Sequence, residues 1–294
     1  MTAIDPRTAN GLRSVRFRNT LLGRVLKDPR GAFGIAIVFL VILATAVSPL
    51  FDEAARTPDT TAILASPSWS HLLGTDEIGR DILARIITGS RVVLQVIAVS
   101  VGSALVLGTA IGLISGYRGG AVDAVIMRIV DAMLAFPLLV LALTIVAALG
   151  SGLHNALIAI TAVVTPRIAR VVRGEVLSLR TREWVDASRI IGLPTFRVLL
   201  RHVLPHLMGT LLVFVALQAS TAILAEASLS FLGLGIQPPE ASWGAMVSAG
   251  ASNLYRSWAL GVFPGLAILL VVTALNLLSD ALGQALRDTE PTDP

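Results

Sequence analysis

The sequence predicts an all-α integral membrane protein with six transmembrane helices, and three observations support this. Of its 294 residues, 54% are hydrophobic and 14% are charged, whereas a soluble globular chain carries about 25% charged residues. The mean hydropathy is +0.79. Several apolar runs of about 20 residues are long enough to cross the roughly 30 Å hydrocarbon core of a bilayer as helices. Cysteine is absent, which excludes disulfides and thiolate metal sites.

Residues 1–30 form a basic tail, and residues 31–50 form the first predicted transmembrane helix. The tail carries seven of the 23 basic residues, and such a cluster beside a span places the N-terminus in the cytoplasm. A cleavable signal peptide is the alternative interpretation. However, the apolar run exceeds the usual 7–15 residues, and Ser48-Pro49-Leu50 is a poor cleavage site. We therefore expect a retained helix.

Residues 51–90 are polar enough to form an external loop. The loop contains a cluster of glycines and charges, made of Gly74, Thr75, Asp76, Gly79, Arg80 and Asp81. The glycines permit tight turns, and the two carboxylates lie within reach of Arg80 and Arg85. We expect the cluster to hold the loop against the start of the next helix. Acid–base chemistry is the alternative, but beyond His71 nothing nearby supplies a nucleophile or a metal-ligand set.

The core of the chain, residues 91–283, is expected to hold five further transmembrane helices. The predicted spans are residues 92–115, 122–149, 153–172, 207–228 and 260–278, followed by a cytoplasmic tail at 284–294. Pro137 is expected to kink the second of these spans, which membrane helices tolerate. Three tryptophans, Trp69, Trp243 and Trp258, are predicted to anchor the outer side at the membrane interface.

The distribution of basic residues supports this topology. It places 18 of the 23 basic residues inside and five outside, as the positive-inside rule requires. These residues flank apolar spans and do not gather in one patch, which argues against a nucleic-acid partner.

A charged stretch at residues 183–206 separates the fourth and fifth predicted spans. Its arginines would each cost roughly 2.5–3.5 kcal/mol at the membrane centre, so it is not a span. Its apolar residues Phe196, Leu199, Leu200 and Val203 fall at helical spacing and are predicted to form one stripe. Gly192 is expected to end one helix and Pro194 to open the next. The stretch is therefore predicted to form a cytoplasmic helix–turn–helix knuckle, with a hairpin lying on lipid headgroups as the alternative.

The knuckle resembles the EAA loop of permease subunits in binding-protein-dependent ABC importers. The motif positions are occupied, with the spacing kept, by Asp186, Ala187, Ser188, Gly192, His202, Leu204 and Pro205. Asp186, Ser188 and His202 depart from the general pattern, although R-H-x-L-P is similar to the peptide and nickel permeases. In that family the loop docks into a groove on the ATPase subunit. The resemblance implies the same coupling role here.

Two other segments resemble the dipeptide/oligopeptide/nickel branch of this family. They are the G-T-D-x-x-G-R-D run at residues 74–81 and the A-S-L-S-F-L-G-L-G run at 227–235. The resemblance implies a type I ABC importer permease of MetI-like fold in a bacterial plasma (inner) membrane. It implies a homologous permease in a heterodimer, two ATPase subunits and an extracytoplasmic binding protein as partners. Peptides are the implied cargo. Nickel or another small solute is the alternative, and an ion-coupled secondary transporter is the rival of a different class.

The sequence has no Walker A loop, which would require a lysine followed by Ser or Thr. Lys27 is the only lysine, and Asp28 follows it. We therefore expect this chain to be no enzyme and to bind no cofactor, while partner subunits use ATP and Mg²⁺.

Three remaining features have competing interpretations. Glu226 is an acid well inside an apolar segment, so it either touches substrate or a partner arginine, or binds backbone amides structurally. His202 and His206 are spaced i, i+4, but the H-E-x-x-H glutamate and a third ligand are missing, so no metal site is expected. The stretch 232–256 is either a docking face for the delivering protein or a connecting loop, and residues 241–250 are a candidate re-entrant helix.

Overall fold

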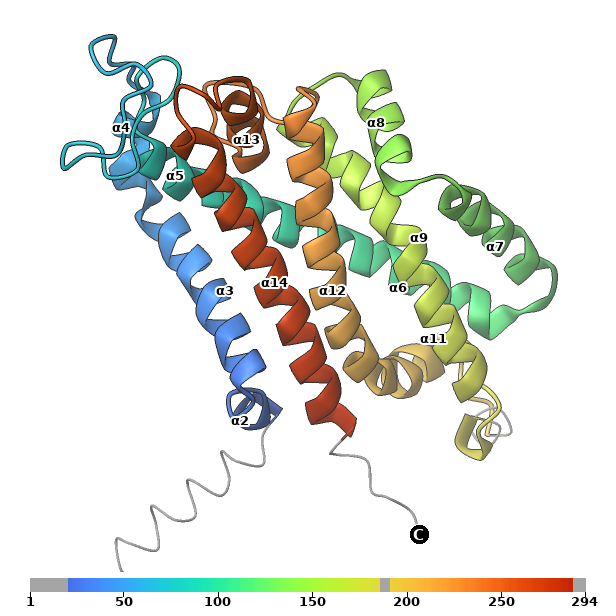
Figure 1. The fold of residues 1–294 in the computed structure, drawn as a ribbon. Coiled ribbons are helices and arrows are strands. Elements are labelled where there is room, and N and C mark those ends of the chain that lie inside the picture. The colour runs from blue at the N-terminus through green and yellow to red at the C-terminus, as the bar shows by residue number, and fades with distance from the viewer. Residues whose placement is uncertain (1–20, 186–190, 288–294) are drawn as a thin grey trace, which may run out of the picture.

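The computed structural model describes residues 21–185 and 191–287, and all the regular elements in these two ranges are helices. Within them, five helical segments are long and apolar enough to cross a membrane, and a sharply bent pair makes a sixth if it is one span. Figure 1 shows the helices as a tilted bundle in which α2 (Leu21–Val25) and α11 (Thr195–Val198) lie at one end and the external loop at the other. The all-α prediction is confirmed.

The N-terminal segment is a helical hairpin whose second helix belongs to the first candidate span. Helix α2 (Leu21–Val25) folds back on α3 (Pro29–Val47), where Asp28 caps α3 by accepting a hydrogen bond from the Arg30 N–H at 2.9 Å. The turn is tight, because a Cβ on Gly31 would lie 2.2 Å from the Val25 carbonyl oxygen. A 3₁₀ turn, η1 (Ser48–Phe51), and a short helix, α4 (Asp52–Arg56), complete this part.

The second span begins ten residues earlier than the predicted start at Val92. Helix α5 (Ile82–Gln95), the π-helix η2 (Val96–Val101) and α6 (Gly102–Arg118) form one segment of 37 residues. The prediction of a loop up to residue 90 was wrong, because the polar side chains there are not solvated. Ser90 is buried and bonds Thr45 of α3 at 2.9 Å, and Arg91 pairs with Asp52 at 2.7 Å.

The predicted span at 122–149 is two helices. Helices α7 (Gly120–Ala135) and α8 (Leu138–Leu149) meet at 95°. The break falls at Phe136-Pro137, where proline removes a backbone donor and disfavours the α conformation of the residue before it. Pro137 therefore breaks the helix where we expected a kink.

Helix α9 (Leu153–Leu179) extends seven residues beyond the predicted end at Val172 and packs along α6. Three glycines of α6 at four-residue spacing, Gly108, Gly112 and Gly116, allow the close approach. Added Cβ atoms there would lie 2.6–2.8 Å from the Cβ atoms of Ile168, Val172 and Val176, respectively. Small residues at this spacing are typical of closely packed membrane helices.

The C-terminal half contains α11 (Thr195–Val198), the π-helix η3 (Leu199–Val203), α12 (Leu204–Phe231), α13 (Trp243–Ser252) and α14 (Ala259–Arg287). Helix α14 packs against both α3 and α12, and α13 covers one end of α12 and α14. Helix α13 overlaps the candidate re-entrant helix at 241–250, but begins and ends two residues later.

The three tryptophans predicted as interfacial anchors differ in their surroundings. Trp69 and Trp258 are 98% and 53% exposed, but Trp243 is only 5% exposed. The Trp243 indole N–H donates to the Ile86 carbonyl oxygen at 2.9 Å. The prediction for Trp243 was therefore wrong: its side chain joins α13 to α5 inside the protein.

Candidate functional sites: the knuckle and the external loop

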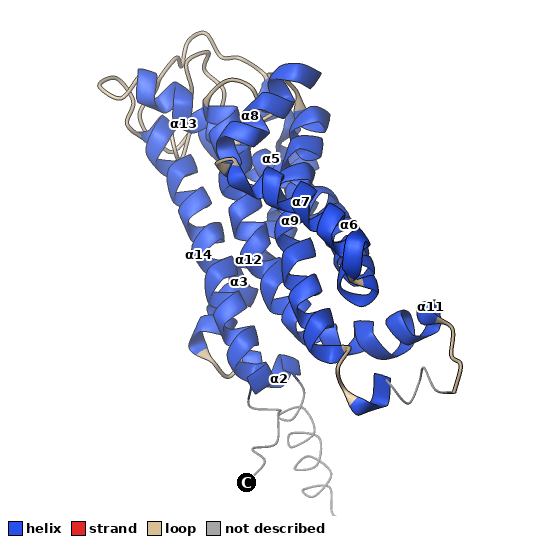
Figure 2. Cartoon of the chain, turned by 90° about the vertical axis from the view of Figure 1, so that its right-hand side faces the viewer, coloured by secondary structure: helices blue, strands red, loops and turns tan. Residues whose placement is uncertain are grey.

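The described parts of the knuckle, residues 183–185 and 191–206, lie at the C-terminal end of α9 and the N-terminal end of α12 (Figure 2). The first three motif positions, Asp186, Ala187 and Ser188, lie outside the described residues. Gly192 lies at the turn with φ of +78°, and no atom of the described neighbouring residues lies within 4 Å of a Cβ added there. The backbone conformation at Gly192 therefore favours glycine, while the space around it would accept a side chain.

The second arm of the knuckle buries a different stripe from the predicted one. Val198 and Val203 are fully buried, whereas Phe196 is 72% and Leu200 43% exposed. The reason is the π-helix Leu199–Val203, whose i→i+5 hydrogen bonding brings residues five apart onto the same side. We predicted that Phe196, Leu200 and Val203 lie on one stripe, assuming 3.6 residues per turn throughout, but their exposure differs: only Val203 is buried.

Apolar side chains therefore protrude from the knuckle. Ile191 is 76% exposed beside Gly192, and Phe196 and Leu200 follow on the next arm. Exposed large apolar side chains that lie together mark a binding surface when water surrounds them. Arg197 and Arg201 are also exposed on this arm.

An aromatic stack joins the two arms. The rings of Trp184 and His206 lie 5.1 Å apart and 17° from parallel. His206 Nδ1 donates to the His202 carbonyl oxygen at 2.7 Å. Among the described residues, no three His, Asp or Glu side chains are placed to hold a metal ion. The histidine pair thus serves packing and backbone bonding within the knuckle.

The last motif positions, Leu204 and Pro205, are the first residues of α12. Proline is accommodated in the first turn of a helix, where its missing N–H is least needed. The chain stays helical from Thr195 through Phe231, and the π-helix lies directly before Leu204 and Pro205.

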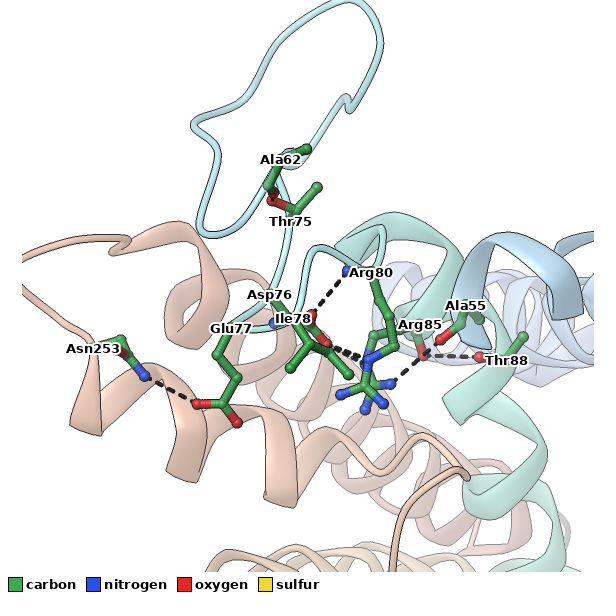
Figure 3. A network of polar contacts seen from close by, with 10 residues as sticks. All are labelled: Ala55, Ala62, Thr75, Asp76, Glu77, Ile78, Arg80, Arg85, Thr88 and Asn253. Atoms are coloured by element: carbon green, nitrogen blue, oxygen red, sulfur yellow. Dashed lines mark hydrogen bonds and ion pairs between the residues drawn. The ribbon is translucent and has the colours of Figure 1, made fainter. Parts of the chain in front are cut away.

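The external-loop cluster is organised around Asp76 (Figure 3). Its carboxylate accepts hydrogen bonds from the backbone N–H groups of Ile78 and Arg80 at 3.1 and 2.9 Å, and from Arg80 Nε at 2.7 Å. Arg85 Nε lies 3.5 Å from the same carboxylate. Asp76 and Arg85 are 2% and 5% exposed, so the pair is inside the protein.

The other cluster residues shape the loop and attach it to three helices. Gly74 and Gly79 have φ of +84° and +87°, and a Cβ on Gly79 would lie 1.8 Å from the Asp59 carbonyl oxygen. Asp81 caps α5 through the Ala84 N–H at 2.9 Å and pairs with His71 at 3.0 Å.

The attachments reach α4 and α13 as well as α5. Arg85 Nη1 donates to the Ala55 carbonyl oxygen of α4 at 3.4 Å, and Asn253, next to α13, donates to Glu77 at 3.3 Å. Asp76 and Asp81 thus face different partners, and their arrangement is that of loop fixation.

Glu226 is buried in α12, with 3% of its surface exposed. Its Oε1 atom accepts hydrogen bonds from the hydroxyls of Ser230 at 2.7 Å and Ser242 at 2.9 Å. The Ser230 oxygen in turn accepts the Ile236 N–H at 3.2 Å. The donors to the carboxylate are hydroxyls, whereas the structural alternative had named backbone amides. The arrangement joins the end of α12 to the start of α13.

The sequence interpretation missed a charged cluster between α7 and α9. Arg173 donates to both carboxylate oxygens of Asp123 at 2.6 Å, and Ser115 donates to the same group. Arg170 pairs with Asp131, which lies eight residues after Asp123 in α7. The available signal was two acids, eight residues apart, in one predicted helix and a row of arginines in another. These pairs hold the bent α7–α8 unit against α9.

Comparison with known proteins agrees with this architecture. Residues 108–288 match the family described as binding-protein-dependent transport system inner membrane component. The dipeptide transport system permease protein DppC of Alkalihalophilus pseudofirmus is 41% identical over 261 residues, 88% of this chain and 86% of that protein.

Two further relatives cover similar shares. The di/tripeptide transport system permease protein DppC of Pseudomonas aeruginosa is 42% identical over 86% of this chain and 85% of its own length. The glutathione transport system permease protein GsiD of Pectobacterium atrosepticum is 39% identical over 87% of this chain and 85% of its own length.

The fold and these similarities define a multi-pass helical membrane protein of the transport class. The chain belongs to the family of inner membrane components of binding-protein-dependent transport systems, and the resemblance inferred from its sequence motifs is confirmed.

Proposed function

We propose that this chain is the transmembrane permease subunit of an ATP-driven importer and forms half of the translocation pathway for di- and oligopeptides. The names of its relatives support the cargo, because dipeptides, di/tripeptides and glutathione are all peptides or peptide-like. Nickel does not occur in those three names, which makes it the weaker alternative.

The observation that carries the proposal is the shape of the knuckle. It presents Ile191 and Phe196 outward and turns at a glycine of positive φ. Its arms connect to α9 and α12, and the Trp184–His206 stack links one arm to the other. A force applied to the exposed surface would therefore reach two spanning helices. In our proposal an ATPase subunit binds this surface, and ATP binding moves the knuckle so that the spanning helices reorient.

The proposed assembly has four other subunits and a fixed orientation. A homologous permease would complete the pathway, two ATPase subunits would hydrolyse ATP, and an extracytoplasmic binding protein would deliver the cargo. Both termini and the knuckle would be cytoplasmic, which agrees with the excess of basic residues on that side. The external loop and α13 would lie on the side of the binding protein.

The experiment that tests the proposal is purification of the chain from its native membrane with identification of the co-eluting subunits. A second permease and two ATPase subunits are expected. The companion binding protein should then bind di- or oligopeptides in a calorimetric titration, with nickel and unrelated small solutes as controls.

Transport by the reconstituted assembly gives the second measurement. Peptide uptake should require ATP on the side of the membrane where the knuckle lies. It should persist without a proton gradient. A lone homo-oligomer whose uptake survives ATP depletion and stops when the proton gradient is removed would overturn the proposal in favour of a secondary transporter.

A further inference from the structure

A basic cavity of about 480 Å³ lies between α2, the start of α3 and the end of α14. Its charged lining residues are Arg24, Lys27, Arg30 and Asp28, and Gln284 adds an amide. We propose that this cavity binds the headgroup of an anionic phospholipid. Neither the cargo nor the orientation of the proposed transporter enters this inference.

The cavity has rigid walls. Val25 packs with Ala281 and Ala285 of α14 in a small apolar cluster, and Gly31 allows α2 to fold closely onto α3. Arg24 is half-buried, and its Nη1 lies 3.4 Å from the Ala285 carbonyl oxygen. The cations are therefore carried by a backbone that three packed helices hold in place.

The charges favour an anion with a phosphate group. Lys27 and Arg30 are exposed, and in residues 21–185 and 191–287 neither of them forms an ion pair with a carboxylate. Asp28 is already engaged as the cap of α3. Basic pockets between membrane helices are recognised binding sites for anionic headgroups, and basic residues near an anionic membrane surface each contribute about five-fold to affinity.

The apolar surroundings select a lipid over a free phosphate. Leu22 is 55% exposed, Leu26 is 38% exposed and Phe33, one turn into α3, is 39% exposed. Exposed apolar side chains beside basic residues are typical of a segment at the boundary between headgroups and acyl chains. A phospholipid can bind the cations through its headgroup and the exposed apolar side chains through its acyl chains, whereas inorganic phosphate can bind only the cations.

The sequence supplies a reporter for occupancy, because Lys27 is the only lysine of the chain. An amine-selective acylating reagent therefore labels only Lys27 and the N-terminal amine. A phosphate bound to Lys27 keeps the ammonium protonated and slows its acylation. A second reporter for general surface charge is Arg182→Lys, an exposed residue shortly after α9, which ends at the same end of the molecule as α2 (Figure 1).

The experiment compares labelling of the full-length protein, carrying Arg182→Lys, in vesicles of phosphatidylcholine alone and of phosphatidylcholine mixed with phosphatidylglycerol. Phosphatidylglycerol should slow acylation of Lys27 more than acylation of the lysine at position 182. Adding Arg30→Gln should lower the apparent affinity for phosphatidylglycerol, measured from the protection of Lys27, about five-fold. The matched control, neutralisation of exposed Arg197 by Arg197→Gln, should leave it unchanged.

Three outcomes would overturn the proposal. Equal slowing at both lysines would show a general effect of surface charge. Full protection in the Arg30→Gln protein, with thermal unfolding unchanged, would show that the cavity's charges do not bind the lipid. Equal protection by inorganic phosphate in phosphatidylcholine vesicles would assign the site to a free anion.

Discussion

Substitution of Gly192 separates the contribution of backbone conformation from that of side-chain contact. At φ of +78° an L-residue other than glycine pays roughly 1–2 kcal/mol. Among residues 21–185 and 191–287, no neighbouring atom lies within 4 Å of an added Cβ, so these residues add no steric term to this cost. If the ATPase recognises the present turn, Gly192→Ala should reduce the apparent affinity between permease and ATPase by about 5- to 30-fold.

The order of the variants tests the cause. Gly192→Val should be impaired at least as much as the alanine variant, because a β-branched residue is a genuine outlier at positive φ. Gly192→Asn should retain most of the affinity, because asparagine visits the left-handed region routinely. Gly174→Ala is the matched control, since Gly174 also has open space for a Cβ but lies inside helix α9 without a positive φ.

The assay is titration of the purified ATPase subunit onto the permease in detergent, followed by ATPase activity and peptide uptake in vesicles. Wild-type affinity and coupling in Gly192→Val would refute the role of the turn. An asparagine variant as impaired as the valine variant would refute the backbone explanation.

Three further substitutions test the fold and the other sites. Gly112→Val should lower the thermal stability of the purified protein by about 1–3 kcal/mol or prevent its assembly, because even a Cβ there would lie 2.6 Å from the Cβ of Val172; unchanged melting would contradict the close packing of α6 on α9. Asp76→Asn should destabilise the protein by about 3–5 kcal/mol in a thermal or denaturant assay, because Arg85 would remain buried without its counter-charge. Glu226→Gln should keep both stability and peptide uptake, since an amide oxygen can still accept both hydroxyl hydrogen bonds, whereas Glu226→Leu should cost about 1–3 kcal/mol of stability per hydroxyl left without its acceptor. Loss of uptake in a stable Glu226→Gln protein would show that the carboxylate itself acts in transport.

Composition and apolar run length predicted the class and the approximate places of the spans, because the bilayer imposes one length requirement on every crossing helix. Those signals are local in sequence. They placed α14 and α12 within a few residues of their observed starts and identified α13 as a short helix.

The error in the predicted start of the second span has a physical reason. Ser90 was predicted in the loop and Arg91 just before the span, but both lie inside a helix, because Thr45 and Asp52, about forty residues earlier, bond to their side chains. Polarity indicates solvent only when no partner from elsewhere in the chain is present.

The knuckle shows the same division between local and tertiary information. Gly192 could be assigned to a turn from its residue type alone, and the structure gives it a positive φ. Which side chains protrude could not be read from a 3.6-residue period, because the π-helix at 199–203 rotates the pattern and exposes Phe196.

The sequence by itself determined that this chain is a helical membrane protein, and its motifs determined the family, since both depend on residues close together along the chain. Only the tertiary structure decided that Asp76 of the external loop meets Arg85 of α5, that Glu226 joins α12 to α13, and that the end of α14 forms a cavity with the basic residues of α2 and α3. Each of those sites depends on groups from separate helices, and the distance between them is set by packing that no single segment encodes.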